Sequence, residues 1–298
     1  MATALDEIKR THAKSSSAAV LDRYLAAQVF ALRTAESALR DDEPDAVHDL
    51  RVAVRRLRSA LRVFRPMFRP DAVGPIRTEL AWLSDLLGEA RDVEVLRHGI
   101  TTSLHDLPDE LVLGPVWVEL DRALAKPEAN TTRAVRAALD SPRYRVLRSA
   151  LDHLLLGRSY RPRAEKPAKK RLRRRVGKAL DKVNAAVSTA AGTDQAAHDA
   201  ALHNVRKKAK RLRYACEAAE PVLGKNARKL GHKSKKIQRT LGDHHDTVEI
   251  RTTLRELGAR AQGEGGNGFT FGLVHGQLDE RATALEQEFA ARAEALPG

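Results

Sequence analysis

One stretch of this sequence occurs twice, and both copies have the pattern of a helix. Residues 47–66, VHDLRVAVRRLRSALRVFRP, match residues 202–221, LHNVRKKAKRLRYACEAAEP, without a gap. A second pair of matching segments follows, LGEARDVEVLR from Leu87 and LGDHHDTVEIR from Leu241. The two motifs are about 40 residues apart in both copies. Two ordered matches at nearly equal spacing predict a duplicated helical unit.

Each repeated helix is predicted to have two distinct faces. Apolar residues recur at steps of three and four in residues 47–66, which is typical of a helix that rests one stripe on a core. A second stripe, of cations, lies roughly 120° around the same helix. Stacked like charges destabilise an isolated helix by roughly a few tenths of a kcal/mol per pair, so we expect an anion to offset them. The stripe contains His48, Arg51, Arg55, Arg58 and Arg62 in the first copy, and His203, Arg206, Lys207, Lys210, Arg213 and Tyr214 in the second.

Positive charge is concentrated in one part of the chain. The 298 residues include 53 Lys and Arg against 39 Asp and Glu, a formal net charge of +14. Between Arg158 and Arg239 lie 25 of these cations and only 6 of the acidic residues. A surface that only keeps a protein soluble normally mixes positive and negative residues. This concentration of positive residues therefore favours a binding site for a polyanion.

Two further segments extend the predicted basic surface. Residues 168–178 follow Pro167 and are predicted to begin a helix. Residues 225–242 are predicted to form a helix with Leu230 and Ile237 inward. The corresponding part of the first copy has no such cationic face, so the anion site is expected to be asymmetric. The added candidates are Arg171, Arg174, Arg175 and Lys178 in the first segment, and Lys229, His232, Lys233 and Lys236 in the second.

The remaining sequence predicts an all-α protein. Ala, Leu, Arg, Glu and Lys dominate, apolar residues recur at helical steps, and no segment alternates as a strand does. The LGEARD and LGDHHD motifs are predicted to form turns between helices after Gly88 and Gly242, with their carboxylates as capping groups. Further breaks between helices are predicted at residues 41–44, 65–75, 107–108, 141–142, 161–167, 221 and 263–268.

The two helices HDLRVAVRRLR and HNVRKKAKRLRY, together with LGEARD and LGDHHD, resemble the CHAD family, the conserved histidine α-helical domain. The resemblance covers residues 12–295, and it implies two antiparallel helical bundles related by a pseudo-twofold axis. We place these bundles at residues 12–156 and 169–295, joined by a basic linker at residues 157–168. A basic groove or pore is implied at their junction.

The resemblance also implies a function, the binding of inorganic polyphosphate along the two cationic stripes. In a crystal, phosphate or sulfate would occupy the polyphosphate site. Val52 and Ser59 stand where the second copy has Lys207 and Tyr214, so the two halves are expected to contribute unequally. Some family members carry a triphosphate hydrolase domain with an ExExK signature. The nearest string here is DEIK at residues 6–9, so we expect no catalytic partner domain.

Other chemistry finds little support in the sequence. There is no nucleophile–base pair and no paired acidic motif for magnesium, so we expect no enzyme activity, no cofactor and no metal. The string DHHD at residues 243–246 has metal-ligand residue types, but adjacent residues on a helix point in different directions. Residues 263–268, GEGGNG, follow no strand and are expected to be a flexible connection rather than a phosphate loop. Phosphorelay through a repeated histidine is disfavoured by the surrounding arginines.

RNA or DNA binding is the main alternative, because nucleic acids present the same phosphate contacts. Aromatic residues make up only 4% of the chain, and Tyr214 stands alone near the basic stripes. Base stacking therefore has few partners. Docking of an acidic protein is a further alternative, and preference for long inorganic chains would separate these functions.

The two repeated histidines are expected to respond to bound phosphate. His48 and His203 lie among guanidinium groups and should resist protonation in the free protein. A bound phosphate would favour the imidazolium form, so binding is expected to tighten as the pH falls toward about 6.

The sequence predicts a cytoplasmic protein that does not span a membrane. The single cysteine, Cys216, excludes an intrachain disulfide. No run of about 18 apolar residues and no secretory signal is found. Polyphosphate binding would associate the protein with polyphosphate granules, and its oligomeric state is left open.

Overall fold

The computed structural model describes residues 15–297, apart from the side chains of residues 195 and 196. Residues 12–14 of the predicted first bundle and the DEIK string lie outside the described residues. Within them the fold is all-α, as predicted, with strand pairing limited to isolated bridges. The helices are α2 Ser17–Arg40, α3 Ala46–Val63, α4 Pro70–His105, α5 Val116–Asp140, α6 Pro142–Leu155, α7 Ala168–Ala191, α8 Gln195–Leu223, α9 Lys225–Gly263 and α10 Phe269–Glu294, with 3₁₀ turns at Arg65–Met67, Asp109–Leu111 and Pro162–Glu165.

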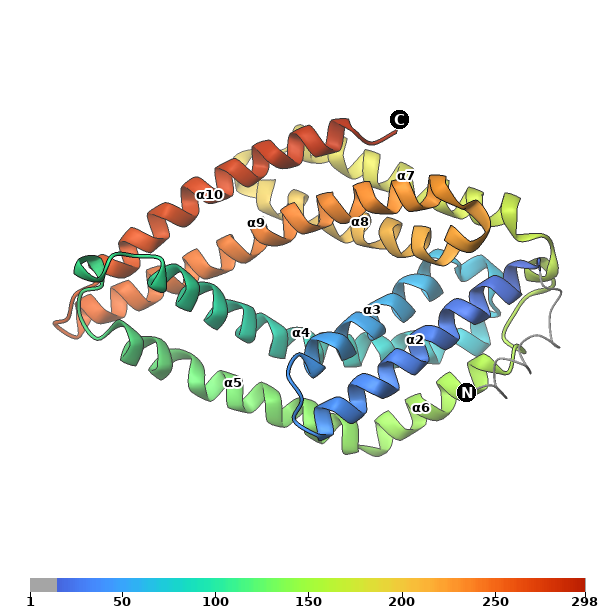
Figure 1. The fold of residues 1–298 in the computed structure, drawn as a ribbon, viewed down its shortest axis with the longest axis horizontal. Coiled ribbons are helices and arrows are strands. Elements are labelled where there is room, and N and C mark those ends of the chain that lie inside the picture. The colour runs from blue at the N-terminus through green and yellow to red at the C-terminus, as the bar shows by residue number, and fades with distance from the viewer. Residues whose placement is uncertain (1–14, 298) are drawn as a thin grey trace.

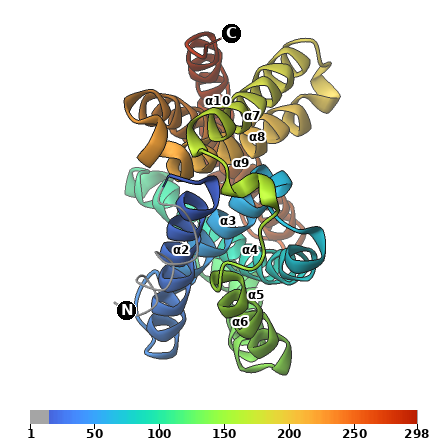
Figure 2. The ribbon, with the colours of Figure 1, turned by 90° about the vertical axis from the view of Figure 1, so that its right-hand side faces the viewer.

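The helices gather into two halves. In Figure 1, α2 to α6 occupy the lower half of the molecule and α7 to α10 the upper half, and Figure 2 shows the same division from the side. In the lower half α3 packs between α2 and α4, and in the upper half α8 packs between α7 and α9. Across the halves, α3 contacts α8 and α4 contacts α9, so the helices with repeated motifs meet between them. The pseudo-twofold relation itself stays a prediction.

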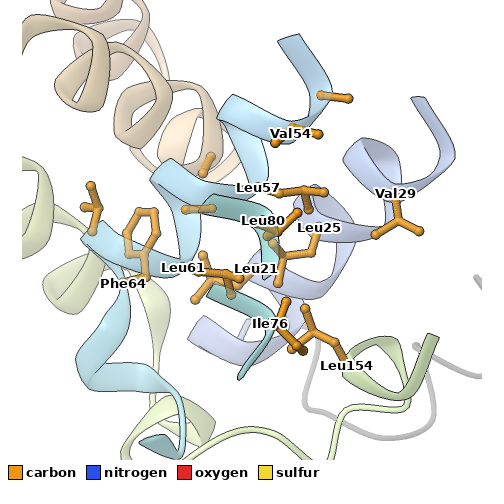
Figure 3. Close-up of a cluster of buried hydrophobic side chains, with 14 of the residues drawn as sticks. Leu21, Leu25, Val29, Val54, Leu57, Leu61, Phe64, Ile76, Leu80 and Leu154 are labelled. Carbon is orange, nitrogen blue, oxygen red and sulfur yellow. The ribbon is translucent and has the colours of Figure 1, made fainter. Parts of the chain in front are cut away.

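The largest hydrophobic cluster crosses between the halves. Leu57 and Leu61 of α3 pack with Leu25 of α2 and Leu80 of α4, all with no exposed surface (Figure 3). Apolar residues of α8 in the range 212–219 belong to the same cluster. Burying one leucine side chain contributes about 1.5–3 kcal/mol, so separating the halves would be costly. The two halves therefore share a core.

Two smaller hydrophobic clusters pack other parts of the long helices. One joins the end of α4 and the start of α5 to the end of α9 and the start of α10, through residues such as Ile100, Leu254 and Phe271. The other joins α7, α8, α9 and α10 through residues such as Val205 and Ile237. Each long helix is therefore packed at more than one place along its length.

The predicted linker, residues 157–168, is hydrogen-bonded to the lower half. The amide of Arg69 donates to the carbonyl of Ser159 at 2.8 Å. The hydroxyl of Tyr160 donates to the carboxylate of Asp22, a buried residue of α2, at 2.6 Å. This segment is therefore an ordered strap that leads into α7.

Most of the predicted breaks separate helices. The predicted helix start at residues 168–178 is also confirmed, because α7 begins at Ala168. The predicted break at residues 65–75 is shorter than expected, since α4 begins at Pro70 and includes Pro75. The confirmed breaks are residues 41–44, 107–108, 141–142, 161–167 and 263–268.

The turns predicted after the two motif glycines are wrong, and so is the capping role given to their carboxylates. Gly88 lies inside α4, Gly242 lies inside α9, and Pro221 lies inside α8 near its end. A glycine costs a helix only about 1 kcal/mol relative to alanine. Leu87 and Leu241, each next to its glycine, are buried in hydrophobic clusters. Tertiary packing therefore keeps both helices continuous at the glycine.

Candidate functional site

The basic stripes of α3 and α8 meet between the two halves. The positive charges that act on Lys210 include Arg206 of its own helix and Arg51 and Arg55 of α3. Those that act on Arg55 include Arg206 and Arg213. The fold thus brings together cations that are more than a hundred residues apart in the sequence. We call the following set the central basic cluster: Arg51, Arg55, Arg206, Lys210 and Arg213.

Burial and mutual repulsion perturb the protonation of this cluster. Burial lowers the pKa of Lys210 to about 7, and Arg206, Arg55 and Arg51 add repulsion. Burial likewise lowers the pKa of both Arg51 and Arg55, although arginine stays charged at neutral pH. A negative charge bound among these groups would favour full protonation. The cluster is therefore suited to an anion.

Several nitrogens in this region have an unmet hydrogen-bonding requirement. Within the described chain, Arg55 Nε, Arg206 Nε and His203 Nδ1 are buried and have no hydrogen-bond partner. Buried polar groups in native proteins are nearly always satisfied by protein or by water. The arginine Nε atoms can only donate, and an imidazole nitrogen donates in one tautomer. A ligand with several acceptor oxygens would complement all of them.

Carboxylates neutralise the central basic cluster only in part. Asp92 of α4 lies 3.4 Å from Arg51 and is 74% exposed. Arg213 pairs with Glu217 at 3.2 Å. Within residues 15–297, the other members of the cluster form no ion pair. Asp243 and Asp246 of α9 also act on Arg206, so negative charge offsets the positive charge of the cluster only in part.

Both repeated histidines border the cluster, and both have a lowered pKa. Burial, Lys207 and His245 lower the pKa of His203 to about 4. The rings of His203 and His245 are in contact, with centroids 4.6 Å apart. Burial and the charge of Arg91 lower the pKa of His48. Both rings therefore resist protonation in the free protein, as predicted, but burial rather than the arginines is the main cause.

Tyr214 does not lie on the basic surface, contrary to the prediction from the helical stripe. Its side chain is 1% exposed. The guanidinium groups of Arg213 and Arg56 lie 5.3 Å and 5.8 Å from its ring centroid. The helical pattern places Tyr214 near the centre of the stripe, but the packing of α8 against α2 and α3 covers its side chain. It supports neighbouring cations and is not accessible to a ligand.

The stripe of α3 divides into two parts. Arg58 and Arg62 lie near Arg211 of α8, whose pKa is lowered by burial and by these two charges. Burial, Arg211 and Arg62 also lower the pKa of Lys208. These residues form a second basic group beside the central one. Lys208 and Arg211 are off the α8 stripe, so only the contact of α3 with α8 reveals them.

The repeated glycine motifs lie along the central basic cluster. Arg91 of LGEARD contributes to the lowered pKa of His48, although it was not among the predicted residues. A Cβ atom on Gly242 would lie 3.5 Å from Arg206 Nε, so the glycine leaves room for this guanidinium against α9. Burial raises the pKa of Asp246 despite the nearby Arg206. Occurrence in a repeated motif was the sequence signal for these residues.

The predicted cations of α7 are not all free for an anion. Arg175 Nε donates to the carbonyl of Val63 at 2.7 Å, which satisfies a carbonyl at the end of α3. Arg171 is half-buried, whereas Arg174 and Lys178 are exposed. Of this predicted set, Arg175 joins the two halves, and the other three lie along α7 outside the central basic cluster.

The predicted cations of α9 are exposed, but most of them lie on a different face from the one that contacts the cluster. Lys233 Nζ donates to the carbonyl of Ala295, just beyond α10, at 2.6 Å. At about 100° per residue, these lysines point roughly 120–180° away from Gly242. Lys229, Lys233 and Lys236 therefore lie apart from the central basic cluster, and their part in anion binding stays a prediction. His232 lies at the border between the two faces.

The adjacent histidines of DHHD point in different directions, as the helical geometry predicts. His245 contacts His203 beside the central basic cluster. His244 is buried and its Nε2 lies 3.0 Å from Oε1 of Glu286 on α10. Asp199 joins this second group, in which one ligand atom from each residue lies within 4.8 Å of the others. Metal-ligand residue types are thus gathered away from the basic residues.

Solved structures share this fold. PptA from Streptomyces chartreusis has a TM-score of 0.76 at 22% identity, covering 94% of this chain and 100% of that one. The CHAD domain from the plant Ricinus communis has a TM-score of 0.72 at 25% identity, covering 96% of this chain and 94% of that one. None of the helices among the described residues is long and apolar enough to cross a membrane.

Curated relatives include the uncharacterized protein Rv2226 of Mycobacterium tuberculosis strain H37Rv and the uncharacterized protein MT2285 of strain CDC 1551. Each is 35% identical over 275 residues, which are 90% of this chain. The chain spans about half the length of these relatives, 51% in both cases. The CHAD domain family matches residues 23–255, most of the chain. This match, the shared fold and the ordered His-x-x-Arg and LGxxxD motifs establish that the chain belongs to the CHAD family.

Proposed function

We propose that this chain binds inorganic polyphosphate at the central basic cluster without acting on it chemically, and that this binding would associate it with polyphosphate granules in the cytoplasm. The observation that carries the proposal is the set of buried nitrogens, Arg55 Nε, Arg206 Nε and His203 Nδ1, that lack a partner among the described residues. Phosphate oxygens are acceptors that would satisfy them once these side chains turn toward the ligand.

The chemistry of polyphosphate matches the composition of the site. A linear polyanion is held by many weak contacts that release counterions, so it needs several cations along a path rather than one deep pocket. Arginine presents a fork of donors that fits phosphate oxygens, and lysine adds a mobile charge. The central basic cluster and the neighbouring group of Arg58, Arg62, Lys208 and Arg211 supply such a path.

An inorganic chain also fits the site better than RNA. Recognition of single strands relies on aromatic rings on which bases stack. Tyr214, the aromatic residue of the α8 stripe, is buried and offers no ring to a base. Family membership supports the same choice, because the resemblance to CHAD proteins carries the expectation of polyphosphate.

The test compares long-chain polyphosphate with single-stranded RNA of equal phosphate number, at about 150 mM salt, where non-specific phosphate contacts are already weak. Two variants with equal loss of charge separate the site from general electrostatics. The site variant is R51A/R55A/R206A/K210A, and the control variant is K225A/K229A/K233A/K236A on the outer face of α9.

Wild type and the control variant should prefer polyphosphate, and the site variant should lose about 100-fold in affinity. Chain length after incubation with stoichiometric protein, read on a gel, should be unchanged. Equal affinity for RNA would assign general nucleic-acid binding instead. Equal losses in the two variants would overturn the placement of the site, and shortened chains would overturn its non-catalytic character.

A further inference from the structure

A second polar cluster lies where α8, α9 and α10 meet, roughly opposite the face of α9 that contacts the central basic cluster. His244 of α9 is 4% exposed, and its Nε2 lies 3.0 Å from Oε1 of Glu286 on α10. Asp199, near the start of α8, places a carboxylate oxygen within 4.8 Å of both ligand atoms. Three helices thus each direct one metal-ligand side chain to the same place.

We propose that Asp199, His244 and Glu286 bind a divalent transition-metal ion of the zinc class. One imidazole and two carboxylates combine a nitrogen donor that suits Zn²⁺ with oxygens that neutralise its charge. Bonds of about 2.0–2.2 Å to a tetrahedral ion place neighbouring ligand atoms roughly 3.3–3.6 Å apart. The 3.0 Å between His244 Nε2 and Glu286 Oε1 is close to this separation. Asp199 is exposed and free to adjust its carboxylate.

His198 supports this assignment as a positioning residue. Its Nε2 lies 3.2 Å from Oε2 of Glu286, so it holds the second oxygen of the same carboxylate. Metal-binding carboxylates are commonly oriented by such hydrogen bonds, and loss of the partner weakens metal affinity about 10–100-fold. The remaining oxygen, Oε1, is the one near His244. The arrangement leaves a coordination position for water, since three side chains bind the ion.

The position of the cluster suggests what the ion would do. It would tie the start of α8 to α9 and α10, because Asp199, His244 and Glu286 come from these three helices. His245, adjacent to His244, contacts His203, which follows Asp199 on α8. A bound ion would therefore hold the histidine pair beside the central basic cluster in a fixed register.

The test uses the full chain after treatment with a chelator, titrated with Zn²⁺ in a calorimeter and with Mg²⁺ for comparison. Wild type should bind one Zn²⁺ per chain at a saturable site and prefer it to Mg²⁺. D199N and E286Q should each weaken Zn²⁺ binding at least about tenfold, and H198A about tenfold. E280Q, an exposed carboxylate on the same helix, should bind as wild type does.

Spectroscopy and folding controls complete the design. Co²⁺ in place of Zn²⁺ should give visible absorption bands that H244N abolishes. D199N changes an exposed residue and should keep the helical circular dichroism of wild type even if E286Q does not. Absence of Zn²⁺ binding in wild type, or equal binding in D199N, E286Q and wild type, would overturn the proposal and leave His244 and Glu286 as a hydrogen-bonded pair.

Discussion

Replacing Lys210 with methionine is expected to stabilise the unliganded protein at neutral pH. Burial among arginines lowers the pKa of Lys210 from 10.5 to about 7. At 1.36 kcal/mol per pKa unit, holding this residue in the folded protein at pH 7 costs about 4 kcal/mol, or about 2–4 kcal/mol allowing for residual contact with solvent. Methionine has a similar length and no charge, so K210M should recover most of this free energy.

The gain should depend on pH in a defined direction. The folded-state pKa is below the unfolded value, so between pH 7 and 10.5 the unfolded chain holds a proton that the folded chain has released. Stability of the wild type therefore rises with pH in this window, whereas below pH 7 the penalty is at its full value. The advantage of K210M should shrink by about 1–2 kcal/mol between pH 6.5 and pH 8.5.

Urea denaturation followed by circular dichroism at these two pH values measures the effect. K225M, an exposed lysine changed in the same way, is the matched control and should stay within about 0.5 kcal/mol of wild type. A K210M protein no more stable than wild type at pH 6.5 would refute the reasoning. A gain in stability that is the same at both pH values would also refute it, because such a gain would not depend on the protonation of Lys210.

Three further predictions concern binding and the fold. Affinity for polyphosphate at constant ionic strength should fall roughly tenfold between pH 6.5 and 8.5 as Lys210 loses its proton, and K210M should flatten this dependence in calorimetry. Y160F should lose about 1–3 kcal/mol in urea denaturation because it leaves the buried carboxylate of Asp22 without this donor, and an unchanged midpoint would contradict the role of the strap. L57A, at a fully buried position, should cost about 2–5 kcal/mol. The matched change L113A, at a side chain 40% exposed, should cost much less, and equal losses would show that the shared core is not where we place it.

The helical fold was predictable because its main signals are local. The steps of three and four between apolar residues predict helices such as α3, and its stripe at Leu57 and Leu61 is buried as expected. Glycine was misleading for the same reason. At Gly242 the local preference for a turn is weak, about 1 kcal/mol, and burial of the neighbouring Leu241 outweighs it. Whether the helix continues through this glycine therefore depends on tertiary packing, which the local sequence pattern does not show.

The site was predictable in part. The stripes of α3 and α8 supply every member of the central basic cluster, whereas other predicted residues lie apart from it. Lys233 donates a hydrogen bond to the carbonyl of Ala295, just beyond α10, and Tyr214 is buried by helix packing. The residue expected to respond to pH is also different. The sequence points to histidines, yet the pKa of His203 falls to about 4, whereas Lys210 titrates at about 7.

The sequence alone is sufficient for the all-α class, the two cationic helices and the polyanion expectation, because periodicity and charge are properties of neighbouring residues along the chain. Tertiary packing selects which cations meet. Arg55 and Lys210 come together through the contact of α3 with α8, and that contact both lowers the pKa of Lys210 and leaves Arg55 Nε buried without a partner among the described residues. His244 and Glu286 meet in the same way, because burial and proximity depend on where each helix lies in space.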